Sequence, residues 1–139
     1  MISAGGAQAA QIETDGGHHE VCDLRSKNPL TVPLRVRHLR RILRERAPDL
    51  VHVRSRVPAW IAKFANRTLR LPLVSTVHGF NSVSAYSAIM TRADAVICVS
   101  TAIRDFVRAN YPTDEAKLHV IPRGVDLTVF DPAAVDPAA

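Results

Sequence analysis

Short runs of apolar and β-branched residues alternate along the chain with stretches that are apolar at helical spacing. The runs predict strands at residues 21–24, 50–53, 73–77, 95–99 and 118–121. The amphipathic stretches predict helices at residues 7–14, 36–47, 58–68, 84–91 and 101–110. Because strand and helix alternate with short connections, the pattern predicts an α/β fold: a Rossmann-like open parallel sheet with helices on both faces.

Several local expectations follow from this pattern. Residues 1–6 match the end of a strand, and Pro33 is expected in a loop before the second helix. Residues 95–99 form the most continuous apolar run and are expected to be a strand buried on both faces. Ser100 or Thr101 is expected to cap the helix that follows. Because their spacing is helical, Trp60, Ile61 and Phe64 are expected on the buried side of their helix.

The candidate site lies in the loops that follow the strands, because open parallel sheets bind ligands beyond the carboxyl ends of their strands. These loops contain the residues predicted to contact substrate: Arg54, Ser55, Arg56, His78, Gly79, Ser100, Arg123 and Gly124. Arginine side chains suit phosphate or carboxylate groups. The alternative for Arg54 and Arg56 is solvated surface charge, and for Ser100 it is a helix cap. For Arg123 and Gly124 it is a structural turn that Asp126 caps. For His78 the alternative is a ring that satisfies a neighbouring backbone group.

Charge is concentrated in one segment. The net charge is +5, and residues 35–46 contain six arginines and one glutamate. Arg37, Arg40, Arg41 and Arg44 therefore predict electrostatic contact with an anionic membrane surface or acceptor, where each nearby cation adds about 1 kcal/mol. The alternative is a solvated helix face. A nucleic-acid partner is not expected, because no aromatic residues are interleaved with the basic ones.

The remaining composition narrows the class of protein. Hydrophobic residues make up 47% and charged residues 22%, which excludes a disordered chain. No window approaches the roughly 18 consecutive apolar residues of a membrane span. Cys22 and Cys98 lie in apolar surroundings without metal-ligand spacing, so they are expected to be buried thiols, with no metal bound. Free thiols indicate a cytoplasmic protein.

Several motifs together resemble those of a known family. They occur in the order SKNP (26–29), DLVHVRSR running into PAW (49–60), STVHG (75–79), ADAVICVS (93–100), IPRGVD (121–126) and FDP (130–132). In this order and spacing the chain resembles the amino-terminal domain of family 4 glycosyltransferases, in a branch similar to bacterial lipopolysaccharide-type sugar transferases. The resemblance covers nearly the whole chain, and IPRGVD followed by FDP is its most specific part.

The resemblance implies a GT-B enzyme with two Rossmann-like lobes and an active site between them. Such enzymes transfer a sugar from a nucleotide-sugar donor with retention of configuration. The amino-terminal lobe mostly holds the acceptor, here a glycan or lipid-linked molecule of the cell envelope. His78 is then expected to be catalytic, with Gly79 letting a ligand approach the backbone. The nucleotide sugar is expected on the complete enzyme rather than on this chain, which is expected to bind no cofactor. The implied location is the cytoplasm, peripheral to the inner face of the membrane.

The sequence also departs from the family pattern. Residues 1–130 are expected to be a partial amino-terminal domain that lacks the first strand and its glycine-rich loop. Residues 131–139 are expected to be a linker towards a donor-binding lobe that the sequence does not contain. The chain alone is therefore expected to be inactive. The alternative is a non-catalytic fragment, or a module that binds anionic membranes or glycans without transferase activity.

Overall fold

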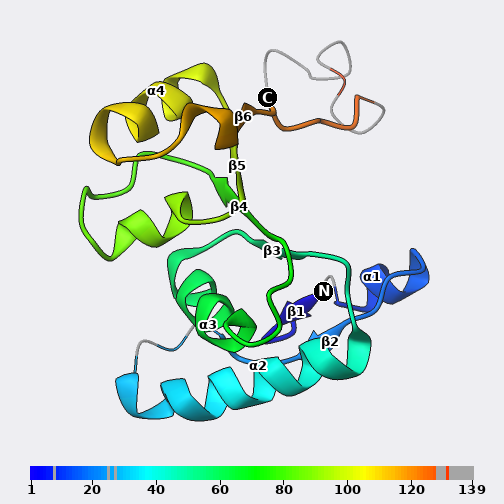
Figure 1. Ribbon diagram of the computed structural model, residues 1–139. Coiled ribbons are helices and arrows are strands. Elements are labelled where there is room, and N and C mark those ends of the chain that lie inside the picture. The colour runs from blue at the N-terminus through cyan, green and yellow to red at the C-terminus, as the bar shows by residue number, and fades with distance from the viewer. Residues whose placement is uncertain (8, 25, 27, 128–130, 132–139) are drawn as a thin grey trace.

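The computed structural model describes residues 1–7, 9–24, 26, 28–127 and 131 of the chain (Figure 1). The first elements are β1 (Ile2–Ser3), α1 (Ala9–Thr14), β2 (Glu20–Val21), the 3₁₀ helix η1 (Pro29–Thr31), α2 (Val32–Arg46) and β3 (Val51–Val53). They are followed by α3 (Arg56–Asn66), β4 (Leu73–Val77), η2 (Ser87–Thr91), β5 (Ala95–Cys98), α4 (Thr101–Asn110), η3 (Glu115–Lys117) and β6 (Leu118–Val120). The open parallel α/β architecture is confirmed.

The strands form two parallel sheets. β1 pairs with β2, and the larger sheet has the order β3-β4-β5-β6. Each neighbouring pair in the larger sheet is parallel and follows the chain order. All four carboxyl ends therefore lie at one edge of this sheet, and the loops after them share that edge. Within the described residues no ladder joins β1 to the larger sheet. The expectation that residues 1–130 form a partial domain without its first strand stays a prediction.

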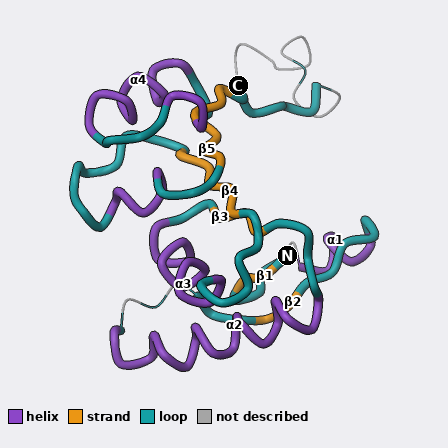
Figure 2. The backbone as a smooth tube through the Cα atoms, viewed as in Figure 1, coloured by secondary structure: helices purple, strands orange, loops and turns teal. Residues whose placement is uncertain are grey.

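One face of the larger sheet carries most of the core. Val53, Val77, Val96 and Cys98 are at most 5% exposed on this face. The helices α3 and α4 lie on the same side of the strands (Figure 2), and α3 also packs along α2. Because consecutive parallel strands are joined by right-handed crossovers, connections that advance in one direction place their helices on one face.

The opposite face is less covered, which corrects one expectation. In β5 the residues alternate between buried and half-buried, so the prediction of a strand buried on both faces is wrong. The polar residues of this face include His52, Thr76 and His78. The alternation arises because successive side chains point to opposite faces of a strand. This face brings polar side chains to the edge where the candidate site lies.

Other boundaries differ from the prediction for identifiable reasons. Pro33 lies in the first turn of α2 rather than in a loop, because the first helical residues need no N–H partner. Ala47 ends this helix in the left-handed conformation, at a φ of 41°.

The strand predicted at residues 21–24 is instead β2, which ends at Val21. The helix predicted at residues 84–91 is the shorter η2. Phe64 is 42% exposed, so its predicted burial is wrong.

The confirmed elements are those with the strongest local signals. β4 has the predicted bounds, and Ser100 caps α4 by accepting a hydrogen bond from the Ile103 N–H at 3.3 Å. Ile61 is 1% exposed as predicted. Both cysteines are free and buried, and burial raises the pKa of each thiol. The linker predicted for residues 131–139 lies outside the described residues, except for Asp131.

Candidate functional site

Three predicted site residues meet at the carboxyl edge of the larger sheet. Arg54 follows β3, His78 follows β4 and Arg123 comes three residues after β6. Arg54 Nε donates to His78 Nε2 at 3.2 Å. On the other side of the ring, an Arg123 guanidinium nitrogen (Nη2) lies 3.1 Å from His78 Nδ1. The structure thus gathers two arginines, 69 positions apart in the sequence, on one imidazole.

The surroundings favour a neutral ring at His78. The pKa of His78 is lowered, first by partial burial and then by the positive charges of Arg54 and Arg123. His52 lies on the same face of β3 as Arg54 and contributes a smaller part of the same effect. A neutral imidazole at the edge of the sheet can donate or accept a proton or a hydrogen bond near neutral pH.

Arg56 does not join this cluster. It begins α3, and its guanidinium donates to the Ser87 hydroxyl at 3.1 Å and lies 5.6 Å from the centre of the Tyr86 ring. These contacts tie the start of α3 to η2. Ser55 precedes the helix and forms no side-chain cap. A role for Arg56 and Ser55 in binding substrate stays a prediction.

The other predicted contact residues have simple structural settings. Ser100 uses its hydroxyl as the cap of α4. Gly79 and Gly124 have space around them, because a Cβ built on either would meet nothing within 4 Å. Neither has a positive φ, so neither backbone requires glycine. The room beside Gly79 is compatible with a ligand approaching the backbone next to His78.

One histidine near the site was assigned no chemistry by sequence reasoning. His52 Nε2 lies 2.7 Å from the Thr76 hydroxyl on the neighbouring strand, and burial lowers the pKa of His52. The alternation of side chains along β3 places His52 on the same face as Arg54. The spacing of two residues between His52 and Arg54 is the signal in the sequence that could have indicated this. Only the register of β3 with β4 shows that His52 lies beside Thr76.

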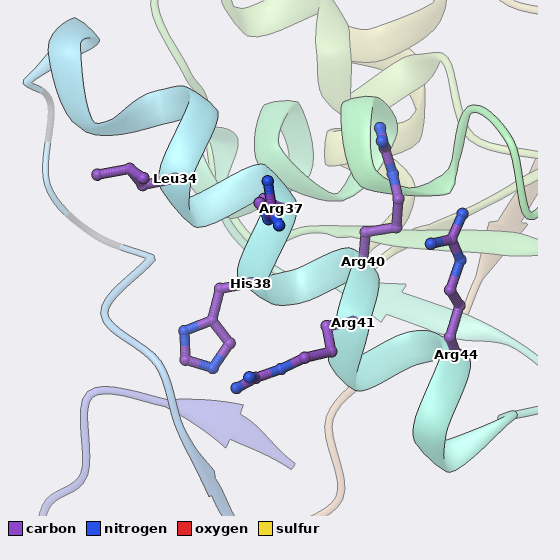
Figure 3. A pocket seen from close by; sticks show the side chains of 6 residues that line it. All are labelled: Leu34, Arg37, His38, Arg40, Arg41 and Arg44. Carbon is purple, nitrogen blue, oxygen red and sulfur yellow. The ribbon is translucent and has the colours of Figure 1, made fainter.

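Four of the six arginines of α2 lie along one side of the helix. Arg37, Arg40, Arg41 and Arg44, together with Leu34 and His38, line a shallow hollow of about 620 Å³ (Figure 3). Arg40 reaches α3 and donates to the carbonyls of Phe64 at 2.9 Å and Ala65 at 3.1 Å. Arg41 pairs with Glu45 at 3.7 Å. We call the set Arg37, Arg40, Arg41 and Arg44 the α2 basic patch.

The other two arginines of this segment have partners elsewhere in the chain, Arg35 in the interior and Arg46 on the surface. Arg35 is 9% exposed and donates to the carbonyl of Asn28 at 3.1 Å and the hydroxyl of Thr31 at 3.1 Å. Arg46 forms an ion pair with Glu20, which lowers the pKa of that carboxyl. The basic surface is therefore smaller than the count of arginines predicts.

The described residues lack both a metal-binding cluster and a membrane-spanning helix. No group of three or more histidine, cysteine or acidic side chains in the described part could hold a metal ion. No helix among the described residues is both long and apolar enough to cross a membrane.

The family of the chain follows from its comparison with known proteins. Residues 2–129 match Glycosyltransferase Family 4, so the chain belongs to this family. A curated relative, alpha-maltose-1-phosphate synthase of Mycolicibacterium smegmatis, is 48% identical over 46 residues. That match covers 32% of this chain and 12% of the relative.

Solved structures agree with this assignment. A glycosyltransferase from Rickettsia africae is 31% identical, with a TM-score of 0.79, over 99% of this chain and 38% of that one. Anabaena Alr3699/HepE, solved in complex with UDP and glucose, has a TM-score of 0.69 and 21% identity, over 92% of this chain and 38% of its own. This second likeness shows the fold alone. The chain spans well under half the length of these relatives.

Proposed function

We propose that this chain is the acceptor-side lobe of a retaining glycosyltransferase that transfers a sugar from a nucleotide-sugar donor. The observation that carries the proposal is the meeting of Arg54, His78 and Arg123 at the carboxyl edge of a family 4 lobe. A sugar transferase must position an acceptor hydroxyl and neutralise the charge that develops on the leaving diphosphate. One imidazole flanked by two permanent cations suits both tasks.

His78 is the proposed catalytic residue. Its ring follows β4 directly and has open space beside it at Gly79. A lowered pKa keeps the ring neutral, so its single N–H can donate a hydrogen bond to an oxygen of the substrate. Arg54 orients this ring through its hydrogen bond to Nε2, and both Arg54 and Arg123 supply positive charge. Arg56, Ser55, Ser100 and Gly124 are proposed to contact substrate at the rim, a role supported by their position after β3, β5 and β6.

The donor would occupy a second lobe. Support comes from the relatives: the chain covers 38% of each solved structure compared above, and Anabaena Alr3699/HepE was solved with UDP and glucose. We propose a cell-envelope glycan or a lipid-linked molecule as the acceptor, and the cytoplasmic side of the membrane as the location. The curated relative's name, alpha-maltose-1-phosphate synthase, supports a sugar product in general.

The test uses the native polypeptide that contains this sequence, purified from its source cells. It is incubated with a panel of nucleotide sugars and with lipid-linked and soluble sugar acceptors, and products are detected by mass spectrometry. The expected result is transfer from one or a few donors, with the anomeric configuration of the donor preserved in the product by NMR. An absence of transfer from every donor, with the folded protein, would contradict the proposal. An inverted product would contradict retention alone.

A second proposed function is docking to an anionic membrane through the α2 basic patch. It is favoured by the hollow that the patch lines along one side of α2. Arg40 is held by α3, which leaves Arg37, Arg41 and Arg44 to supply most of the contact. The chain is expected to sediment with vesicles that contain anionic lipid at low salt and not with neutral vesicles. Equal sedimentation with both kinds of vesicle, or with neither, would refute this docking.

A further inference from the structure

The hydrogen bonds around His78 leave one contact without an acceptor. A neutral imidazole has one N–H and one lone pair, whereas guanidinium nitrogens only donate. Nε2 accepts from Arg54 Nε, so Nδ1 carries the proton. That N–H then lies 3.1 Å from Arg123 Nη2, which also only donates. Protonating the ring would make both contacts donor against donor.

An oxygen atom beside Nδ1 and Arg123 would resolve this mismatch, because it could accept from both groups. Solvent water can supply such an oxygen, but it brings no charge. The ion pairs of the described residues use other arginines, namely Arg41, Arg46, Arg104 and Arg108. An anionic oxygen therefore gains attraction from Arg123 and, across the ring, from Arg54, which water does not.

We propose that a phosphate group of the substrate binds against Nδ1 of His78 and the guanidinium of Arg123, with Arg54 holding the ring from the Nε2 side. This inference rests on the proposed function and specifies a substrate class for the same site. A phosphate has several acceptor oxygens, so it can accept from the ring N–H and from the planar guanidinium fork together. The phosphate belongs either to a phosphorylated sugar acceptor or to the donor diphosphate.

The position of the cluster supports this ligand. It lies beyond the carboxyl ends of β3, β4 and β6, where parallel sheets bind their ligands. The nearby Gly79 offers open space instead of a side chain. Arg54 has a distinct role from Arg123: its Nε bond fixes which ring nitrogen carries the proton, so it is a positioning residue.

The experiment is calorimetric titration of the 139-residue chain with inorganic phosphate at constant ionic strength. Binding is expected to saturate. Arg123→Gln removes a charge-assisted hydrogen bond and is expected to weaken binding by about tenfold to a hundredfold. Arg123→Lys keeps the charge and should restore part of the affinity. The matched control is Arg108→Gln on α4, whose guanidinium pairs with Glu115 at 3.6 Å and whose loss should leave binding unchanged.

Two further ligands identify the source of the phosphate. Tighter binding of glucose 1-phosphate than of UDP assigns the site to a phosphorylated acceptor, and the reverse order assigns it to the donor; both outcomes support the phosphate site. Unsaturable binding to the wild type, or equal affinities of Arg123→Gln and Arg108→Gln, would overturn it. The titration needs no sugar transfer, so a chain that binds phosphate while its native polypeptide transfers no sugar refutes only the proposed function.

Discussion

Arg40 and Arg37 both lie on α2, but only Arg40 is expected to contribute to the stability of the fold. Replacing each by glutamine and comparing the free energies of unfolding tests this difference. The guanidinium of Arg40 donates to the carbonyls of Phe64 and Ala65, which lie in the last turn of α3. The last four carbonyls of a helix have no partner within the helix, and the helix dipole makes this end negative. Arg40 thus caps α3 from a neighbouring helix, whereas the side chain of Arg37 makes no hydrogen bond or ion pair within the described residues.

The expected cost of Arg40→Gln follows from these contacts. A hydrogen bond to a charged group contributes about 1.5–3 kcal/mol when buried, and a cation at a helix carboxyl end contributes about 0.3–1 kcal/mol. One of the two bonds is only part-buried and the other is exposed, so solvent weakens both. We therefore expect a loss of about 1–2 kcal/mol in the free energy of unfolding. Arg37→Gln should stay within about 0.5 kcal/mol of the wild type.

Urea denaturation followed by circular dichroism measures both variants. The same proteins can be tested against anionic vesicles, where Arg37→Gln is expected to weaken binding about fivefold, the loss of one near-surface cation. Equal stability losses in the two variants would refute the assignment of Arg40 as the cap of α3. An unchanged vesicle affinity in Arg37→Gln would count against the α2 basic patch as a membrane contact.

Three other changes test the core and the site. Ile61→Ala, at a position 1% exposed, should cost about 2–5 kcal/mol in urea unfolding, and a loss below about 1 kcal/mol would contradict its burial. Gly79→Ala should leave the unfolding free energy within about 0.5 kcal/mol of the wild type but weaken substrate binding by the native polypeptide. A destabilised fold with normal binding would exclude the proposed approach of a ligand to the backbone at Gly79. The folded pKa of His78 is below its unfolded value near 6.5, so the unfolded state gains protons first and stability falls as pH drops through that range. His78→Asn should show a shallower fall in unfolding free energy between pH 7 and pH 5, and an unchanged slope would contradict the lowered pKa.

Elements with strong local signals were predictable from the sequence. β4 was predicted with its bounds because a β-branched run ends at a histidine and a glycine. The start of α4 was predicted because Ser100 is a favourable amino-terminal cap. The start of α2 was missed because Pro33 signals a loop as readily as the first turn of a helix. Local sequence does not separate these two settings.

The candidate site was predictable in position but not in its contacts. The rule for parallel sheets indicated the loops that hold Arg54, His78 and Arg123. The convergence of both arginines on one ring depends on the order and register of β3, β4 and β6, which are tertiary facts. Arg56 follows the same strand but turns to η2, because its place in the first turn of α3 aims its side chain there. Sequence spacing contains no information on that direction.

The most direct test of the central claim is the turnover number for sugar transfer by the native polypeptide that contains this sequence, with and without His78→Ala. The matched control is His119→Ala, an exposed histidine within β6. If His78 contacts the reacting sugar, its loss is expected to lower the turnover number by about a hundredfold or more while the fold is kept, and the control should transfer normally. Near-normal turnover in His78→Ala would contradict the account.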